Sequence, residues 1–342
     1  MIKKIGIAGT AKNTGKTTAT MSLISRWPSP ASLAVTSIGY DGEEIDNVTN
    51  LPKPRLHLTT GSIVVTAEKC LNAGSAVLEK LEKLELQVPL GSLFICRVRR
   101  SGLVVLAGPN SKKTLEQTVA CLDKYNVRVL LVDGALNRLA PMGIVDGLII
   151  ATGASRNTNI EELAQEAQAI EFLLNLPQLT IQEPALHVTN LLIERNLKVY
   201  SFADCTHSFI EFSGMVDIKP FTRLTETLSQ CPSLPGLVFS NPIKLLLCGD
   251  LLKMSLLIRD YCREGGNVGV RSPLSLLSVT INPFYPLYNK ANREFVKSWL
   301  DADEMWSTMS SRLKTPVVDV VRQGEDALYQ LVMEAVNGKC QN

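Results

Sequence analysis

The residues most able to do chemistry lie near the start of the chain, in the run Gly9-Thr10-Ala11-Lys12-Asn13-Thr14-Gly15-Lys16-Thr17-Thr18. A short apolar segment, residues 5–8, precedes this run, and residues 19–24 follow it with helical spacing. Strand, glycine-flanked loop and helix in this order bring backbone N–H groups and the positive end of a helix dipole to one concavity, where phosphate binds. The Lys16 ammonium can reach the β- and γ-phosphates of a nucleotide, and the Thr17 hydroxyl can hold Mg²⁺.

Two carboxylates are expected to complete this site. Asp133 ends the apolar run 129–132 in a Walker B pattern, where the carboxylate supports Mg²⁺ directly or through a water. Asp41 is the first acidic residue after the second expected strand, and the alternative for its loop is a plain solvated acidic surface. We therefore expect Lys16, Asp41 and Asp133 to be catalytic and Thr17, Asp41 and Asp133 to bind the metal. The nucleotide is expected to contact Gly9, Thr10, Lys12, Asn13, Thr14, Gly15, Lys16, Thr17 and Thr18.

A mainly parallel sheet must position these residues. Apolar strands are expected over 2–8, 33–38, 127–132 and 147–152, and they alternate with helices. This alternation predicts a doubly wound α/β fold with both faces of the sheet covered. We also expect a helix over about 67–84 and a hairpin from strands 93–98 and 103–107.

The best domain boundary lies at Leu176-Pro177-Gln178. It predicts a P-loop NTPase domain over 1–178 and a second α/β region over 179–342. Apolar segments and helical patterns continue more weakly through this second region, which is either a separate domain or a continuation of the first sheet.

The loop has Thr10 where the usual pattern has a glycine. This variant resembles the loop of dethiobiotin synthetases and related P-loop NTPases of the SIMIBI class, and its Lys-Asn-Thr-Gly-Lys-Thr-Thr core is similar to that of molybdopterin-guanine dinucleotide accessory proteins. The resemblance implies that Asn282, which ends an apolar segment, contacts the base, and that a homodimer forms. ATP is favoured over GTP because the nearest guanine-reading pattern, residues 289–292, lacks its Asp.

A further resemblance covers about the first 155 residues. Its phrases are residues 6–18, 36–43, 51–55, 66–70, 132–138 and 151–154. They resemble P-loop proteins of amino-acid-fermenting anaerobes, which we associate with the nucleotide-binding subunit of the reactivating factor for lysine 5,6-aminomutase. This resemblance implies ATP-driven release of damaged cobalamin, with the aminomutase and a second reactivase subunit as partners. The sequence has no Asp-x-His-x-x-Gly motif, so we do not expect this chain to hold cobalamin itself.

Three functions therefore compete. The first, which we favour, is an ATPase that acts on a partner enzyme. The second is a ligase or kinase for a small carboxylate or amine, with Lys12 or Lys53 at the substrate. The third is a GTP-binding protein for cofactor delivery. In each of them the chain positions a phosphoryl group and neutralises its charge.

Composition limits the partners, metal sites and cellular location that we expect. The 342 residues carry a net charge of +2, so nothing electrostatic favours nucleic acid. Eight cysteines without a Cys-x-x-Cys pair, with only three histidines, argue against a zinc or iron–sulfur site. Cysteines scattered in apolar runs indicate buried thiols in a reducing compartment. We find no signal peptide and no apolar run of roughly 18 residues, so we expect a cytoplasmic protein without a membrane span.

Overall fold

The structure is a computed structural model that describes residues 1–41, 56–136, 139–181, 185–195, 197 and 207–338. Its contacts divide the chain into two units. The first unit comprises residues 1–164 and 276–342, and the second comprises residues 165–275. Each unit is built on a sheet with parallel strands, so the expected α/β class is confirmed.

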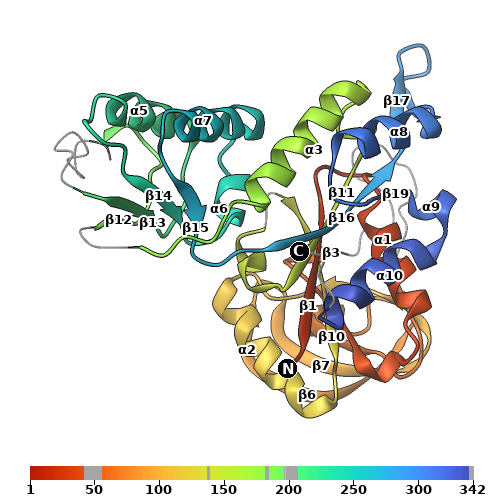
Figure 1. The fold of residues 1–342 in the computed structure, drawn as a ribbon. Helices are drawn as coiled ribbons and strands as arrows, with labels where there is room; N and C mark the ends of the chain where they lie inside the picture. The colour runs from red at the N-terminus through yellow and green to blue at the C-terminus, as the bar shows by residue number, and fades with distance from the viewer. Residues whose placement is uncertain (42–55, 137–138, 182–184, 196, 198–206, 339–342) are drawn as a thin grey trace. The chain divides into compact units, whose positions relative to one another are not determined.

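The first unit is centred on a nine-stranded sheet in the order β19-β16-β11-β1-β10-β2-β5-β7-β6 (Figure 1). Its strands are β1 (Lys3–Gly9), β2 (Leu33–Ser37), β5 (Ile63–Ala67), β6 (Val77–Val88), β7 (Gly91–Arg100), β10 (Val129–Ala135), β11 (Gly147–Gly153), β16 (Ser275–Asn282) and β19 (Val317–Val318). β1 runs parallel to both β10 and β11, and β2 runs parallel to β10 and β5. β7 pairs antiparallel with β5 and β6. Parallel neighbours bring the carboxyl ends of the central strands to one edge, where ligands bind in such sheets.

Helices cover both faces of this sheet. α1 (Lys16–Arg26), α9 (Val320–Gln323) and α10 (Glu325–Val336) lie on one face, and α2 (Lys112–Leu122) lies on the other (Figure 1). The remaining helix of this unit is α8 (Ala302–Arg312). The central strands β10 and β11 are buried along almost their whole length, and their residues are mostly apolar because neither face meets water.

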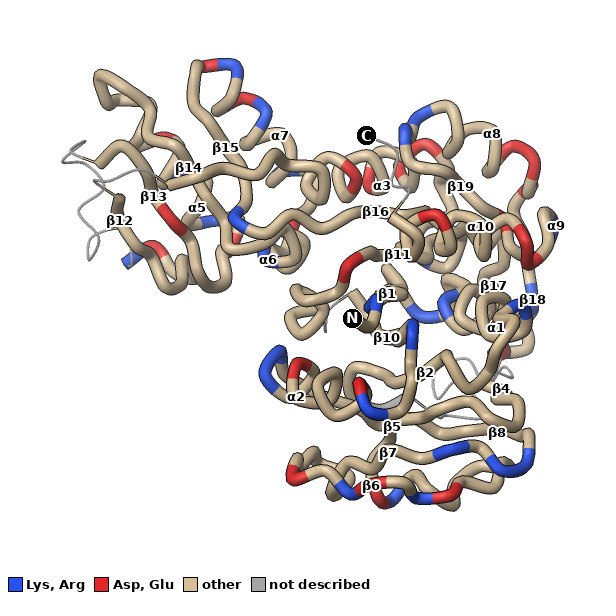
Figure 2. The backbone as a smooth tube through the Cα atoms, turned by 60° about the horizontal axis from the view of Figure 1, so that its bottom comes forward, with Lys and Arg blue, Asp and Glu red and all other residues tan. Residues whose placement is uncertain are grey.

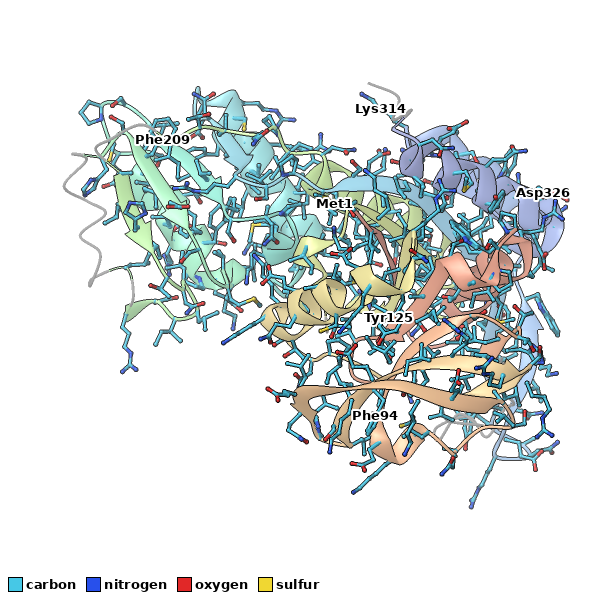
Figure 3. The ribbon with its side chains drawn as sticks, turned by 90° about the horizontal axis from the view of Figure 1, so that it is seen from below. Met1, Phe94, Tyr125, Phe209, Lys314 and Asp326 are labelled. Atoms are coloured by element: carbon cyan, nitrogen blue, oxygen red, sulfur yellow. The ribbon has the colours of Figure 1, made fainter. Side chains whose placement is uncertain are left out.

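α1 and α10 pack through both apolar and charged contacts. The rings of Trp27 and Tyr329 meet edge to face with centroids 5.8 Å apart. Arg26 forms an ion pair with Asp326, which Figure 3 labels at the exposed side of α10. The end of the chain is thus packed against the helix that begins at the glycine-flanked loop.

The expected helix over 67–84 is wrong, because residues 77–88 form strand β6. Leu78, Leu81 and Leu84 have the spacing of a helix face, but β6 pairs with β7 through several register shifts, one of which skips Leu81. A bulge adds a residue to one strand, so it converts an alternating pattern into one that resembles a helix. β6 is also an edge strand, and its interspersed Glu and Lys residues, visible in Figure 2, protect that edge from pairing with another chain.

The expected hairpin of strands 93–98 and 103–107 is also wrong. β7 forms its hairpin with β6, whereas β8 (Gly102–Val104) pairs with β4 (Leu56–Leu58). β9 (Leu106–Ala107) pairs with β3 (Tyr40–Asp41). β8 and β9 therefore each pair with a strand more than 40 residues earlier in the chain, rather than with β7 across a local turn.

The second unit holds a four-stranded parallel sheet, β12-β13-β14-β15. Its elements are β12 (Ala185–Val188), β13 (Phe209–Phe212), β14 (Gly236–Phe239), β15 (Val268–Val270), α5 (Ile218–Leu228), α6 (Ile243–Leu246) and α7 (Leu251–Arg263). α3 (Ile160–Leu174) contains the boundary between the units. Three buried aromatic rings, Phe212, Phe221 and Phe239, pack together at centroid distances of 5.0 to 6.3 Å.

This division corrects the expected domains. The boundary at 178 falls within the second unit, and residues 276–342 belong to the first unit rather than to a region 179–342. The physical reason is that β16 and β19 extend the nine-stranded sheet beside β11. The second unit is thus an insertion between β11 and β16.

Two expectations from composition can be compared with this structure. No helix in the described ranges combines the length and apolar character that crossing a membrane requires. Cys231 is disulfide-bonded. The expectation that the cysteines are buried thiols is therefore wrong for this residue. Burial raises the pKa of the Cys96 thiol to about 12, so this thiol stays protonated within the sheet.

Candidate phosphate-binding site

The glycine-flanked loop connects β1 to α1 at the carboxyl edge of the sheet. β1 ends at Gly9 and α1 begins at Lys16. Asn13 and Gly15 both have left-handed backbones, with φ of 62° and 88°. Gly15 brings no side chain to cap α1, and the first turn of α1 contains no acidic residue. A helix start of this kind presents its N–H groups and dipole to an anion.

Buried threonines hold the loop in place. The Thr10 main-chain N–H donates to the Ala151 carbonyl at 2.9 Å, and the Thr10 hydroxyl donates to the Thr152 hydroxyl at 3.0 Å. The Thr14 hydroxyl donates to the Ala11 carbonyl at 3.0 Å. Thr10 therefore replaces the usual glycine with a side chain that ties the loop to β11. The sequence indicated Thr10 as a loop residue but not its bond to Thr152, because Thr10 follows β1 and Thr152 lies in β11, two strands that only the fold makes neighbours.

Lys16 and Asp133 form the charged centre of the site. In the register of β1 and β10, Ile7 lies opposite Asp133. Asp133 is therefore two residues before Ala135, which pairs with Gly9 at the end of β1. The Lys16 Nζ is 2.9 Å from Asp133 Oδ1, and Asp133 is fully buried. A buried carboxylate requires a compensating charge, which the lysine supplies. The structure thus pairs two of the expected residues, one at the start of α1 and the other in β10.

Asn282 reaches the same loop from the end of β16. Its side-chain Nδ2 donates to the Asn13 carbonyl at 2.8 Å, and its Oδ1 accepts from the Phe284 main-chain N–H at 3.2 Å. Its own carbonyl accepts from the Ala154 N–H at 2.9 Å. These bonds give Asn282 a role in supporting the loop, which sequence reasoning missed. Contact between Asn282 and a base stays a prediction.

The remaining expected residues have varied positions. Thr17 and Thr18 are half-buried in the first turn of α1, and Lys12 is exposed in the loop. A Cβ added to Gly9 would lie 3.1 Å from the Thr14 hydroxyl, so this glycine allows the close turn. The Asp41 backbone pairs with Leu106, but its side chain lies outside the described part of the structure, as do Lys53 and the rest of the acidic loop. The metal-binding role of Asp41 stays a prediction.

The donor set suits magnesium bound together with phosphate. Among the residues that the structure describes, no group of three or more His, Cys, Asp and Glu side chains could hold a metal ion alone. Mg²⁺ at nucleotide sites takes one or two carboxylates and completes its shell with phosphate oxygens and water. Of the expected metal ligands, the side chains of Thr17 and Asp133 lie in the described part of the structure, and their binding of Mg²⁺ stays a prediction.

The fold places a strand–loop–helix turn beside a carboxylate on the neighbouring parallel strand, an arrangement that is typical of phosphate-binding sites. Comparison with known proteins found no family model, no curated protein and no solved structure that matches this chain.

Proposed function

We propose that this chain binds a nucleoside triphosphate with Mg²⁺ and hydrolyses it, with ATP as the preferred nucleotide. The observation that supports the proposal best is the 2.9 Å pair between Lys16 and buried Asp133 beside an uncapped helix start. The pair keeps a lysine and a carboxylate together at the place where a triphosphate and its metal would bind.

Each side chain has a role in this proposal. Lys16 neutralises charge on the β- and γ-phosphates, and the loop N–H groups orient them. Thr17 and Asp133 would hold Mg²⁺, which when bound neutralises charge on the β- and γ-oxygens. Asn282 keeps Asn13 in its left-handed conformation, so that the loop is already shaped for the phosphates.

The proposal extends to an accessory role toward a partner enzyme. The resemblance of the first 155 residues is its support, and it suggests a cobalamin-dependent aminomutase as that partner. In such a role hydrolysis is slow in the isolated chain and faster with the partner. Turnover measured with and without an inactivated aminomutase tests this extension separately from nucleotide binding.

Isothermal titration with ATP, GTP and ADP, each with and without Mg²⁺, tests the central proposal. We expect heat and thermal stabilisation with ATP and Mg²⁺, weaker binding of GTP, and loss of turnover in Lys16→Ala and Asp133→Asn. Lys112→Ala, which removes an exposed lysine at the start of α2, is the matched control and keeps turnover unchanged. Absence of heat and stabilisation with every triphosphate contradicts the proposal, as does normal turnover in folded Lys16→Ala.

A further inference from the structure

A two-stranded ribbon leaves the first unit directly after Asn282. β17 (Phe284–Asn289) pairs antiparallel with β18 (Glu294–Trp299), and residues 290–293 form its tip. The root is fixed, because the Leu300 N–H donates to the Pro283 carbonyl at 2.9 Å and the Ser155 hydroxyl donates to the Phe284 carbonyl at 3.0 Å. In Figure 1 the tip projects away from the helices of this unit.

The ribbon exposes apolar side chains on both of its faces. Leu287 and Val296 lie opposite each other on one face, and they are 48 % and 39 % exposed. Tyr288 and Trp299 lie on the other face, and they are 48 % and 59 % exposed. A two-stranded hairpin is marginally stable by itself in water, and four large exposed apolar side chains on one short ribbon mark a place of interaction.

Charges of opposite sign lie at the two ends of the ribbon. The tip carries the exposed cations Lys290 and Arg293, beside the exposed carboxylate of Glu294 at the start of β18. At the root, α8 opens with an acidic cluster, Asp301, Asp303 and Glu304, of which Asp303 forms an ion pair with Arg322 at 2.6 Å. Within that cluster Asp301 caps α8 by accepting from the N–H groups of Asp303 and Glu304. Six residues of strand separate tip and root, a distance of about 20 Å at ~3.4 Å per residue.

We propose that this ribbon is the docking surface for a second copy of the chain. Two ribbons that lie antiparallel across a twofold axis place each basic tip against the acidic start of the partner's α8 and cover one apolar face of each ribbon between them. One surface then supplies both halves of the interface, as a twofold contact requires. The acidic cluster also argues against a phosphate-rich polymer as the occupant, because it would repel the backbone that the tip attracts.

Charge reversal combined with mass measurement tests this interface. Sedimentation equilibrium of the full chain over a concentration series gives the dimer dissociation constant. We expect Lys290→Glu/Arg293→Glu and Asp303→Lys/Glu304→Lys each to raise that constant about tenfold or more, and the combination of all four changes to restore it to within about threefold. Lys113→Glu/Lys253→Glu alters net charge equally on α2 and α7 and serves as the control.

A second pair of changes guards against local misfolding. Leu287→Thr/Trp299→Thr keeps strand-forming residues while removing exposed apolar surface, and it also weakens the dimer in a chain whose thermal unfolding is unchanged. A wild-type chain that stays monomeric at every concentration overturns the proposal. A dimer that both charge reversals leave unaltered overturns it as well. These measurements use no nucleotide, so they stand or fail independently of the proposed hydrolysis.

Discussion

Asn282 lies 269 positions after Asn13 in the sequence, yet its Nδ2 donates to the Asn13 carbonyl across 2.8 Å. Asn13 has a left-handed backbone, a conformation that non-glycine residues seldom adopt without support. The end of β16 therefore holds the left-handed part of the loop. The candidate phosphate-binding loop has this support only when the chain returns to the first unit after its inserted second unit.

Replacement of this asparagine tests its support of the loop. Asn282→Ala removes the side-chain hydrogen bond to Asn13, worth about 1 kcal/mol, together with the bond from the Phe284 N–H, and from the loss at Asn13 we expect the affinity for ATP with Mg²⁺ to fall about fivefold. The dissociation constant from isothermal titration measures the effect, with thermal unfolding as a check on the fold. Asn337→Ala, at the exposed end of α10, is the matched control. An unchanged affinity in Asn282→Ala would show that Asn13 keeps its conformation without help.

Glycine at position 15 is required for two separable reasons. Its φ of 88° disfavours any side chain, and an added Cβ would lie 3.2 Å from the Cβ of Asn282. Gly265 has a similar φ of 96°, and a Cβ added to it would have no neighbouring atom within 4 Å. Gly265→Ala therefore measures the backbone contribution alone, a loss of about 1–2 kcal/mol in the free energy of unfolding. We expect Gly15→Ala to cost more than Gly265→Ala in urea unfolding and, unlike it, to impair nucleotide binding. If the two variants lost the same free energy of unfolding, Asn282 would have to shift away from the added Cβ without a measurable loss of stability.

The loop and Asp133 were predictable because their signals are local. A buried parallel strand is apolar along its length, and the polar residues that follow it stand out at its carboxyl end. Lys16 and Asp133 could be assigned to one site from sequence because each lies near the carboxyl end of such a strand. Their distance could not be predicted, since it depends on β1 and β10 being direct neighbours.

Other parts of the fold depend on partners that are distant in the sequence. Residues 77–88 contain a helical spacing of leucines, and only the bulged pairing with β7 makes them a strand. Likewise, no local pattern indicates that β16 joins the nine-stranded sheet after the inserted second unit. Asn282 reaches the loop only because β16 joins this sheet, so its role in supporting the loop could not be predicted from the sequence either.

A double-mutant cycle measures how strongly Lys16 and Asp133 depend on each other. Lys16→Met leaves a buried carboxylate without this partner, and we expect a loss of about 3 kcal/mol in the free energy of unfolding. Lys16→Met/Asp133→Asn should cost less than the sum of the single changes, with a coupling of about 1–3 kcal/mol. The exposed pair Lys112–Glu116 is the control cycle, for which we expect a coupling of about 0.5 kcal/mol or less. A coupling near zero for Lys16 and Asp133 would mean that other groups compensate the carboxylate.

Acid should destabilise the second unit through Glu211. Burial alone would raise the pKa of this carboxyl, but hydrogen bonds from Arg271 and His187 outweigh it and hold the pKa below the ordinary value of 4.5. A carboxyl with a lowered pKa in the folded state adds stability above its unfolded pKa, and that stability is lost as the pH falls through the folded value. Amide hydrogen exchange of β12 and β13, followed from neutral pH to below 4.5, should therefore show protection decreasing with acid.

Glu211→Gln separates this titration from general acid effects. The variant loses the charge-assisted bonds at every pH, so we expect about 1–2 kcal/mol less protection at neutral pH and a flatter acid response than in the wild type. Half of the Arg271 side chain is exposed, which keeps the expected loss at the lower end for such a pair. Glu264→Gln removes an exposed carboxylate in the same unit and should leave both the protection and its pH dependence unchanged. If Glu211→Gln retained the full acid response, the titrating group would have to be a different carboxyl.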